Sequence, residues 1–144
     1  MKFSVATKVN QEAIEVWNGF DKELFLKLSP PFPKVRLIQF DGSSKGDTVG
    51  LELNFVLFRQ KWISDITENE ENEKEIYFID QGRTLPFFLS RWKHVHRILK
   101  KSKGSVILDE INFSTGFILT DILFFPLLYL QFIYRKPIYK REFS

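Results

Sequence analysis

The sequence of 144 residues contains no cysteine, which excludes disulfide bonds and thiol chemistry. Histidine is nearly as scarce, because its two copies, His94 and His96, both fall in one short segment. The sequence also has no phosphate-binding loop, no nucleophile elbow and no zinc-site spacing of ligands. Any chemistry that depends on an imidazole must therefore use this one segment.

Long linkers, low-complexity segments and internal repeats are absent as well. A chain of this length has enough residues for one core and few for a second, so we expect one domain over residues 1–144. Residues 1–7 lack the long apolar region of a secretory signal. With the missing cysteine, this predicts a cytoplasmic protein.

Aromatic residues are abundant, at 16% of the sequence, with sixteen Phe, four Tyr and three Trp. Each aromatic side chain provides a large apolar area. A chain rich in them can line a wide cavity as readily as it can fill a core.

The net charge of +3 is unevenly distributed along the sequence. One acidic cluster comprises Glu68, Glu70, Glu71, Glu73 and Glu75, and one basic cluster comprises Arg91, Lys93, Arg97, Lys100, Lys101 and Lys103. We expect both clusters to be solvated hairpin ends and expect no nucleic-acid partner, because a basic hairpin alone lacks a recognition motif. Attraction of an anionic lipid or of a carboxylated ligand remains an alternative.

Hydrophobic periodicity predicts an α+β fold with an antiparallel sheet. Asn10 is a suitable N-cap for the first of two short helices. The expected helices cover residues 11–20, 22–28 and a terminal segment, and the expected strands cover residues 3–9, 35–40, 48–59, 60–67, 75–81, 91–98 and 105–113. In the long strand 48–59, we expect Leu51, Leu53, Phe55 and Leu57 to share one face.

The histidine strand places its chemistry on one side. Trp92, His94, His96 and Ile98 alternate with polar residues and so share a face that suits a half-polar interior. In the next strand, Asp109 lies among the apolar residues that alternate with it. A four-residue connection between the strands keeps the two buried faces together. We therefore expect His96 to lie opposite Asp109, with His94 one diagonal step away.

This cluster has three interpretations. Asp109 could orient an imidazole for acid-base catalysis, which makes His94, His96 and Asp109 the catalytic candidates. Asp109 could instead form a structural hydrogen-bonded pair with one of the histidines. We favour this interpretation, because buried polar groups need partners whether or not they react. Two histidines and a carboxylate also resemble a metal site, but the pattern is weak. We expect neither a metal nor another cofactor.

The terminal segment 116–134 is almost entirely apolar and approaches the ~20 residues that span a bilayer. Against spanning, Asp121 would cost about 2.5–3.5 kcal/mol near the bilayer centre, and Pro126 should interrupt the helix. We therefore expect a helix whose apolar residues are buried against a curved sheet, with reversible membrane contact as a lesser alternative.

Several motifs, taken in order, resemble the SRPBCC superfamily of START, birch-pollen-allergen and polyketide cyclase-like proteins. These are residues 78–81 (Phe-Ile-Asp-Gln), Pro86-Phe87, residues 92–96 (Trp-Lys-His-Val-His), residues 109–111 (Asp-Glu-Ile) and residues 132–135 (Phe-Ile-Tyr-Arg), with Tyr139 and Phe143. The bacterial ligand-binding or cyclase-like branch is the most similar. The resemblance implies a helix-grip fold, in which about seven antiparallel strands wrap a long C-terminal helix and two short helices follow the first strand.

Two departures from the family pattern border the expected mouth of the cavity. Leu85 precedes Pro86-Phe87, where relatives often have glycine, and residues 117–125 are unusually apolar. The size of a ligand therefore cannot be taken from the family.

The sequence thus favours a binding protein for a small hydrophobic or aromatic molecule over an enzyme. The expected ligand-binding residues are Trp92, His94, His96, Asp109, Ile111, Phe113, Tyr134 and Arg135. Arg135 should either reach a polar or anionic group of the ligand or form a salt bridge with Asp109, Asp80 or Glu110. Two alternatives are a polyketide cyclase or dehydratase using a cavity histidine with Arg135, and a lipid or membrane-surface binding protein. The oligomeric state is not determined.

Overall fold

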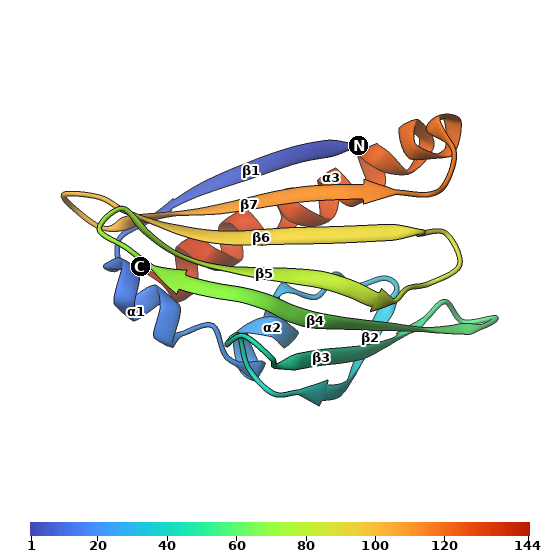
Figure 1. The fold of residues 1–144 in the computed structure, drawn as a ribbon, viewed down its shortest axis with the longest axis horizontal. Helices are drawn as coiled ribbons and strands as arrows, with labels where there is room; N and C mark the ends of the chain where they lie inside the picture. The colour runs from blue at the N-terminus through green and yellow to red at the C-terminus, as the bar shows by residue number, and fades with distance from the viewer.

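The computed structural model describes all 144 residues and contains seven strands and three helices (Figure 1). In chain order these are β1 (Lys2–Val9), α1 (Ala13–Asn18), α2 (Lys22–Leu28), β2 (Lys34–Phe40), β3 (Thr48–Asn54), β4 (Arg59–Glu71), β5 (Glu75–Thr84), β6 (Arg91–Lys100), β7 (Ser105–Ser114) and α3 (Ile118–Glu142). The order of elements is the one expected from the sequence.

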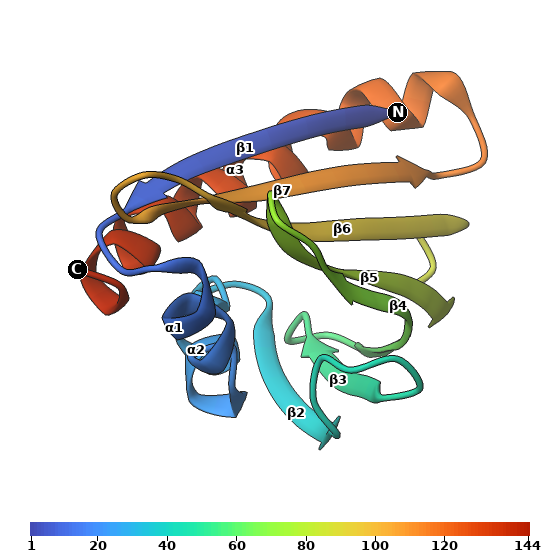
Figure 2. The same cartoon turned by 60° about the vertical axis from the view of Figure 1, so that its left-hand side comes forward.

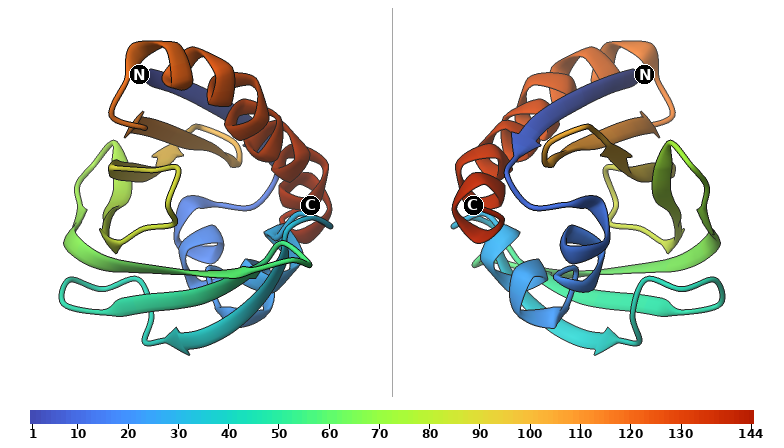
Figure 3. Two further views of the ribbon diagram at one scale, coloured as in Figure 1. Left: turned by 90° about the vertical axis from the view of Figure 1, so that its right-hand side faces the viewer. Right: turned by 90° about the vertical axis from the view of Figure 1, so that its left-hand side faces the viewer.

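All seven strands form one antiparallel sheet in the order β1-β7-β6-β5-β4-β3-β2. The first strand therefore pairs with the last, while the other strands follow one another as a meander. The sheet curls, with α3 along the β1 side of its concave face and α1 and α2 at one end (Figures 2 and 3). This is the helix-grip arrangement.

The start of α1 differs from the expectation. The helix begins at Ala13, and Asn10 does not cap it. The backbone N–H groups of Asn10 and Gln11 instead donate to the carbonyl oxygen of Phe143, both at 3.1 Å, so this segment is held by the C-terminus. In α2 the cap is present, because Asp21 Oδ1 accepts a hydrogen bond from the Leu24 N–H at 2.9 Å.

The expected strand 48–59 is wrong in its second half. It ends at Asn54, and the chain turns back through Val56 and Leu57 into β4, with the Phe55 N–H donating to the Phe58 carbonyl oxygen at 2.9 Å. Leu57 is 92% exposed at the tip of this hairpin. The alternation of apolar residues continues through the turn, which is why periodicity alone did not reveal it.

Two clusters of buried apolar side chains form the core. One joins α1, α2 and the last turns of α3 to the sheet, and Ile107 and Tyr139 are among its most buried residues. The other lies under the middle of α3 and includes Phe113 and Phe132. The alternation predicted for β7 is confirmed, since every second residue from Ser105 to Phe113 is buried.

The long helix α3 corrects two expectations. It is continuous through Pro126, which therefore does not interrupt it. Leu128 and Phe132 are buried, but Leu119 and Leu123 are exposed, and only 17% of the most apolar 18-residue window is buried. By length and composition the helix could cross a membrane. The expected burial of its apolar residues is thus correct for one side of the helix and wrong for most of its first half.

Candidate functional site

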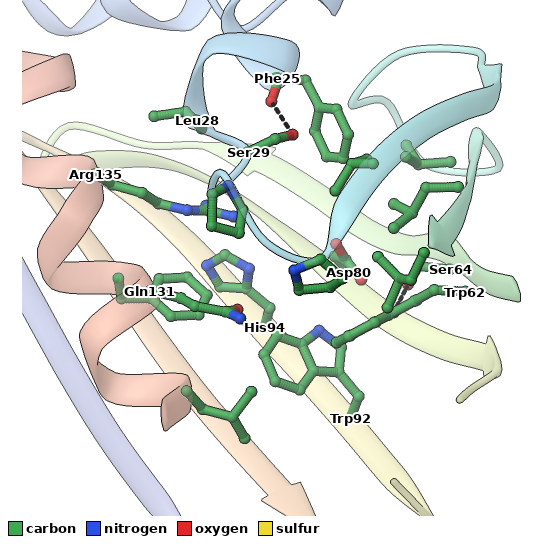
Figure 4. Close-up of a pocket in the computed structure, with 18 of the residues that line it drawn as sticks. Phe25, Leu28, Ser29, Trp62, Ser64, Asp80, Trp92, His94, Gln131 and Arg135 are labelled. Carbon is green, nitrogen blue, oxygen red and sulfur yellow. Dashed lines mark hydrogen bonds between the residues drawn. The ribbon is translucent and has the colours of Figure 1, made fainter. Parts of the chain in front are cut away.

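A pocket of about 620 Å³ lies between the concave face of the sheet, the α2 segment and α3 (Figure 4). Of its 37 lining residues, 25 are hydrophobic. Such a wall disfavours a strongly polar occupant, since polar groups of a ligand would lose water without gaining partners.

Aromatic rings form much of the pocket wall. Trp62 and Trp92 meet edge to face, with ring centroids 4.9 Å apart, and the Trp62 Nε1–H donates to Ser64 Oγ at 3.2 Å. Nearer the surface, Phe88 stacks on Phe124 with a centroid distance of 5.1 Å. These contacts join β4 to β6, and the β5–β6 connection to α3, and they hold flat apolar surfaces toward the pocket.

The histidine strand provides the polar part of the pocket. His96 is paired with Asp109 across β6 and β7, as predicted. The hydrogen bond nevertheless joins Asp109 to its diagonal neighbour, because His94 Nε2 lies 2.8 Å from Asp109 Oδ1. His96 Nδ1 is 3.6 Å from the same oxygen. The Nε2–H tautomer of His94 is the one that donates to the carboxylate.

His96 is held by stacking more than by hydrogen bonds. Its ring lies 3.4 Å from the His94 ring and 4.1 Å from that of Phe78, measured between centroids. Its Nε2 is 3.9 Å from Asp80 Oδ2, and neither ring nitrogen has a hydrogen-bond partner. Both nitrogen atoms are themselves buried, so a molecule in the pocket does not reach them in this arrangement.

Both imidazoles are neutral at ordinary pH. Burial lowers the pKa of His94 to about 3, and the charge of Arg135 acts in the same direction. Burial also lowers the pKa of His96 to about 4, opposed by Asp80 and Asp109. Burial disfavours the charged form of each ring, and the nearby carboxylates do not outweigh it.

The two carboxyl groups respond differently to this environment. Burial raises the pKa of Asp109, although the charge of Arg135 opposes the change. Burial also favours protonation of Asp80, but its interactions with His96 and His94 outweigh that effect and lower its pKa. Tyr139 lies beside this cluster, and its burial raises the pKa of its hydroxyl group.

Arg135 brings a positive charge into the pocket from α3 (Figure 4). No carboxylate lies within 4.0 Å of its guanidinium group, so the expected alternative of a salt bridge is not present. The guanidinium carbon instead lies 4.4 Å from the ring centroid of Phe132, a cation–π contact. An unpaired, partly buried guanidinium group is a ready partner for an anion.

The pocket wall includes five of the eight expected ligand-binding residues, namely Trp92, His94, His96, Tyr134 and Arg135. Asp109, Ile111 and Phe113 lie outside it. Asp109 is 1% exposed beneath the histidines, and Ile111 and Phe113 are packed under α3 in the second core cluster. They point to the concave side as expected, but α3 covers that part of the sheet.

Asp80 also lines the pocket, whereas the sequence analysis named it only as a salt-bridge partner for Arg135. It lies on β5 opposite His94. The alternation that identified Asp109 also applies here, since Ile76 and Phe78 are buried on the same face of the strand as Asp80. The signal was therefore present in the sequence.

Asp80, His94 and His96 form the one group of side chains with the composition of a metal site, and their potential ligand atoms lie within 4.8 Å of one another. His94 Nε2 is also engaged by Asp109, and the charge of Arg135 is close enough to depress the His94 pKa. These features suit an organic anion better than a cation.

No family model matches the sequence. A stretch of 77 residues is 29% identical to serpin A11 of Rattus norvegicus, and it covers 54% of this chain and 18% of that protein. The chain thus matches less than a fifth of the length of this curated relative.

Solved structures share the architecture over most of the chain. Norcoclaurine synthase from Thalictrum flavum, in complex with dopamine and hydroxybenzaldehyde, is 15% identical with a TM-score of 0.61, covering 88% of this chain and 76% of that one. The Zhui aromatase/cyclase from Streptomyces sp. R1128 is 11% identical with a TM-score of 0.66, covering 96% and 90%. Ara h 8.0201 is 11% identical with a TM-score of 0.60, covering 96% and 97%. The chain therefore shares the helix-grip fold of these solved structures.

Proposed function

We propose that the protein binds a small apolar or aromatic molecule that carries a carboxylate or similar anionic group. The apolar part occupies the pocket between the sheet and α3, and the anion pairs with Arg135. The unpaired guanidinium group in a hydrophobic pocket is the observation that carries this proposal.

The electrostatics of the pocket support an anionic ligand. Arg135 has no carboxylate partner, and its charge acts on both His94 and Asp109. The two imidazoles are neutral, so Arg135 is the one positive charge in the pocket wall. A charged group taken out of water is costly unless it is paired, so an anion gains more here than a neutral polar group.

The size and walls of the pocket support an apolar or aromatic body. Its volume of about 620 Å³ is within the range of pockets that take small organic molecules. The rings of Trp62, Trp92 and Phe88 are suited to stacking on flat ligands. A protein of the same fold, norcoclaurine synthase, is seen in complex with two small aromatic molecules.

Native mass spectrometry of the protein from its own host, followed by denaturation and identification of any released molecule, is the first experiment. A panel of aromatic and aliphatic carboxylic acids, each with its neutral amide, then tests the charge requirement by thermal shift and calorimetry. We expect the acids to raise the melting temperature and the amides to do so much less.

Arg135→Met should weaken binding of the acid about tenfold or more and leave that of the amide nearly unchanged. Arg141→Met is the matched control, because Arg141 is an exposed arginine six residues further along α3 and does not line the pocket. A pocket that prefers the amides, or that binds neither series, would overturn the proposal.

A second candidate is a cyclase or dehydratase, favoured by the bond between His94 and Asp109 at the pocket floor. A carboxylate that orients a neutral imidazole is a common acid-base arrangement. The pKa of His94, however, is lowered to about 3, far from the value near neutrality that suits a general base. His94→Ala decides between the two: it should abolish turnover of an enzyme, but change the affinity of a binding protein only modestly.

A further inference from the structure

The mouth of the pocket is surrounded by exposed apolar side chains. Five Phe and Leu side chains both line the pocket and are more than 40% exposed: Phe32, Phe58, Phe87, Leu127 and Leu130. We call these residues the mouth rim. Single exposed apolar residues are ordinary on a protein surface, but a contiguous group around a cavity opening marks an interaction site.

The apolar surface extends beyond the rim at the same end of the molecule. Val56 and Leu57 form the tip of the β3–β4 hairpin, and the first two turns of α3 add Ile118, Leu119, Ile122 and Leu123. The tip of this hairpin, the β5–β6 connection with Phe87, and the start of α3 all lie toward the right of Figure 1. The C-terminus, α1 and the β4–β5 turn lie toward the other end.

The hairpin tip is apolar at a cost to the fold. A two-residue hairpin turn favours asparagine and glycine, because they accept a positive φ. Here Val56 has a φ of 77°, although β-branched residues rarely adopt that region. Both tip side chains are at least 82% exposed, so they contribute little to stability through packing. The folded chain alone gives no reason for these two residues, whereas an apolar partner does.

The charges that border this apolar surface indicate which partner it binds. Next to the hairpin tip, exposed cations are carried by β2 and β4, namely Lys34, Arg36, Arg59 and Lys61, and Glu52 is the one carboxylate among them. In the apolar segments 54–58, 85–89 and 115–131, the one charged residue is Asp121, which is buried and bonded to Thr115. The acidic cluster at Glu68–Glu75 lies toward the other end, where Glu71 and Glu75 pair with Lys100 and Arg97. An apolar surface bordered by cations is complementary to an anionic lipid bilayer.

The helix does not need to leave the fold to contact lipid. Phe132 and Tyr139 hold the second half of α3 in the two core clusters, so insertion of the whole helix would disrupt both. The exposed face of the first half is already available. Contact in the plane of the interface, with side chains reaching about 5–10 Å into the boundary of the acyl chains, is sufficient.

We propose that this end of the molecule docks reversibly on the surface of an anionic lipid membrane, with the mouth rim facing the bilayer. The docking goes beyond ligand binding and stands without it, because it uses residues other than Arg135. Where the proposed ligand also partitions into lipid, it would pass between bilayer and pocket without crossing water.

Sedimentation with vesicles tests the docking directly. At low salt, we expect the protein to sediment with phosphatidylcholine vesicles that contain phosphatidylglycerol, and much less with pure phosphatidylcholine. High salt should release most of the bound protein, because exposed charges are screened over about 3–10 Å. Substituting both Arg59 and Lys61 by Gln should weaken binding by about tenfold or more, since each cation near an anionic surface contributes about fivefold.

The variant L119Q/L123Q removes apolar groups from the helix face and keeps good helix formers. It should weaken vesicle binding about tenfold or more. Ile14→Gln is the matched control, because Ile14 is a 51% exposed helical residue at the other end of the molecule. That variant should bind vesicles like the unaltered protein.

The variant V56G/L57N separates docking from folding. Glycine accepts the positive φ at position 56, and asparagine is a common residue at position 57 of such a turn, so the melting temperature should stay the same or rise while vesicle binding falls severalfold. Arg135→Met should keep vesicle binding and lose the anionic ligand, so the two proposals fail independently.

Three results would overturn the docking. The unaltered protein could fail to sediment with the anionic vesicles at low salt. Ile14→Gln could weaken binding as much as the helix variant. Light scattering could show a dimer that the helix variant dissociates, without vesicle binding, which would assign the apolar surface to a second copy of the chain.

Discussion

His94 Nε2 lies 2.8 Å from Asp109 Oδ1, although the residue paired with Asp109 across the two strands is His96. The bond is diagonal, and it leaves both nitrogens of His96 without a partner. One imidazole is thus held by a hydrogen bond, and the other by ring contacts with His94 and Phe78.

Stability should decrease in weak acid because of these imidazoles. The pKa of each is lowered from 6.5 in the unfolded chain, to about 3 for His94 and about 4 for His96. The unfolded state therefore binds more protons below about pH 6.5, and the stabilisation present above that pH is lost as the pH falls toward 4. The expected slope is about 1.4 kcal/mol per pH unit for each imidazole that stays neutral.

Urea unfolding at a series of pH values measures this slope. His94→Gln keeps a hydrogen-bond donor for Asp109 and should make the slope shallower. Asp109 acts in the opposite direction, because its raised pKa lets the folded state keep a proton above pH 3.8, where the carboxyl group of the unfolded chain loses it. An unfolding free energy that stays constant over this range in the unaltered protein would contradict the burial of neutral imidazoles.

Arg135 should contribute little to stability and measurably to the titration of His94. It has no ion-pair partner, so Arg135→Met should change the unfolding free energy by less than about 1 kcal/mol at neutral pH. Its charge lowers the pKa of His94, so the variant should titrate at higher pH. Nuclear magnetic resonance of the two imidazole rings measures this shift. A large loss of stability would mean that Arg135 serves the fold.

Much of the fold could be predicted from the sequence because its signals are local. Alternation on β7 placed Asp109 on the buried face, and the four-residue connection set the register that brings His96 opposite it. The choice of His94 for the hydrogen bond could not be predicted in this way. It depends on how two side chains lean along their strands, which strand periodicity does not specify.

The wrong predictions about which residues are buried, and about what covers them, share a physical cause. Apolar residues at Leu57 and Leu119 follow the same pattern as core residues, so periodicity assigned them to the interior. Ile111 and Phe113 face the concave side as expected, but whether a pocket or a helix covers them depends on where α3 lies. Sequence pattern shows that a residue is apolar and on which face it lies. Tertiary packing decides what covers that face.

Phe132 should be the main apolar support of the pocket floor. Its ring lies within 6.2 Å of the rings of Trp92 and His94, and its own exposure is 3%. Phe132→Ala should cost about 3–5 kcal/mol of unfolding free energy, through lost burial and the cavity left behind. Phe117→Ala is the control, because Phe117 is 75% exposed and its removal should cost less than about 0.5 kcal/mol. Equal effects of the two substitutions in urea unfolding would contradict the packing described.

Gly104 should be required for the hairpin that positions the histidines. It has a φ of +68°, and a Cβ atom there would lie 2.4 Å from the Val9 carbonyl oxygen, which is backbone and cannot easily move. Gly104→Ala should therefore cost more than the about 1 kcal/mol expected from the positive φ alone. Gly46→Ala is the matched control, because Gly46 also has a positive φ, +95°, but no atom within 4 Å of the added Cβ. A larger loss of stability for Gly104→Ala in chemical unfolding would show that the close approach of β1 to the β6–β7 turn fixes the register of β6 and β7. In that variant, nuclear magnetic resonance of His94 and His96 should then report a looser pairing of the two strands. If the two variants are equally stable, the contact with Val9 is not what fixes the hairpin.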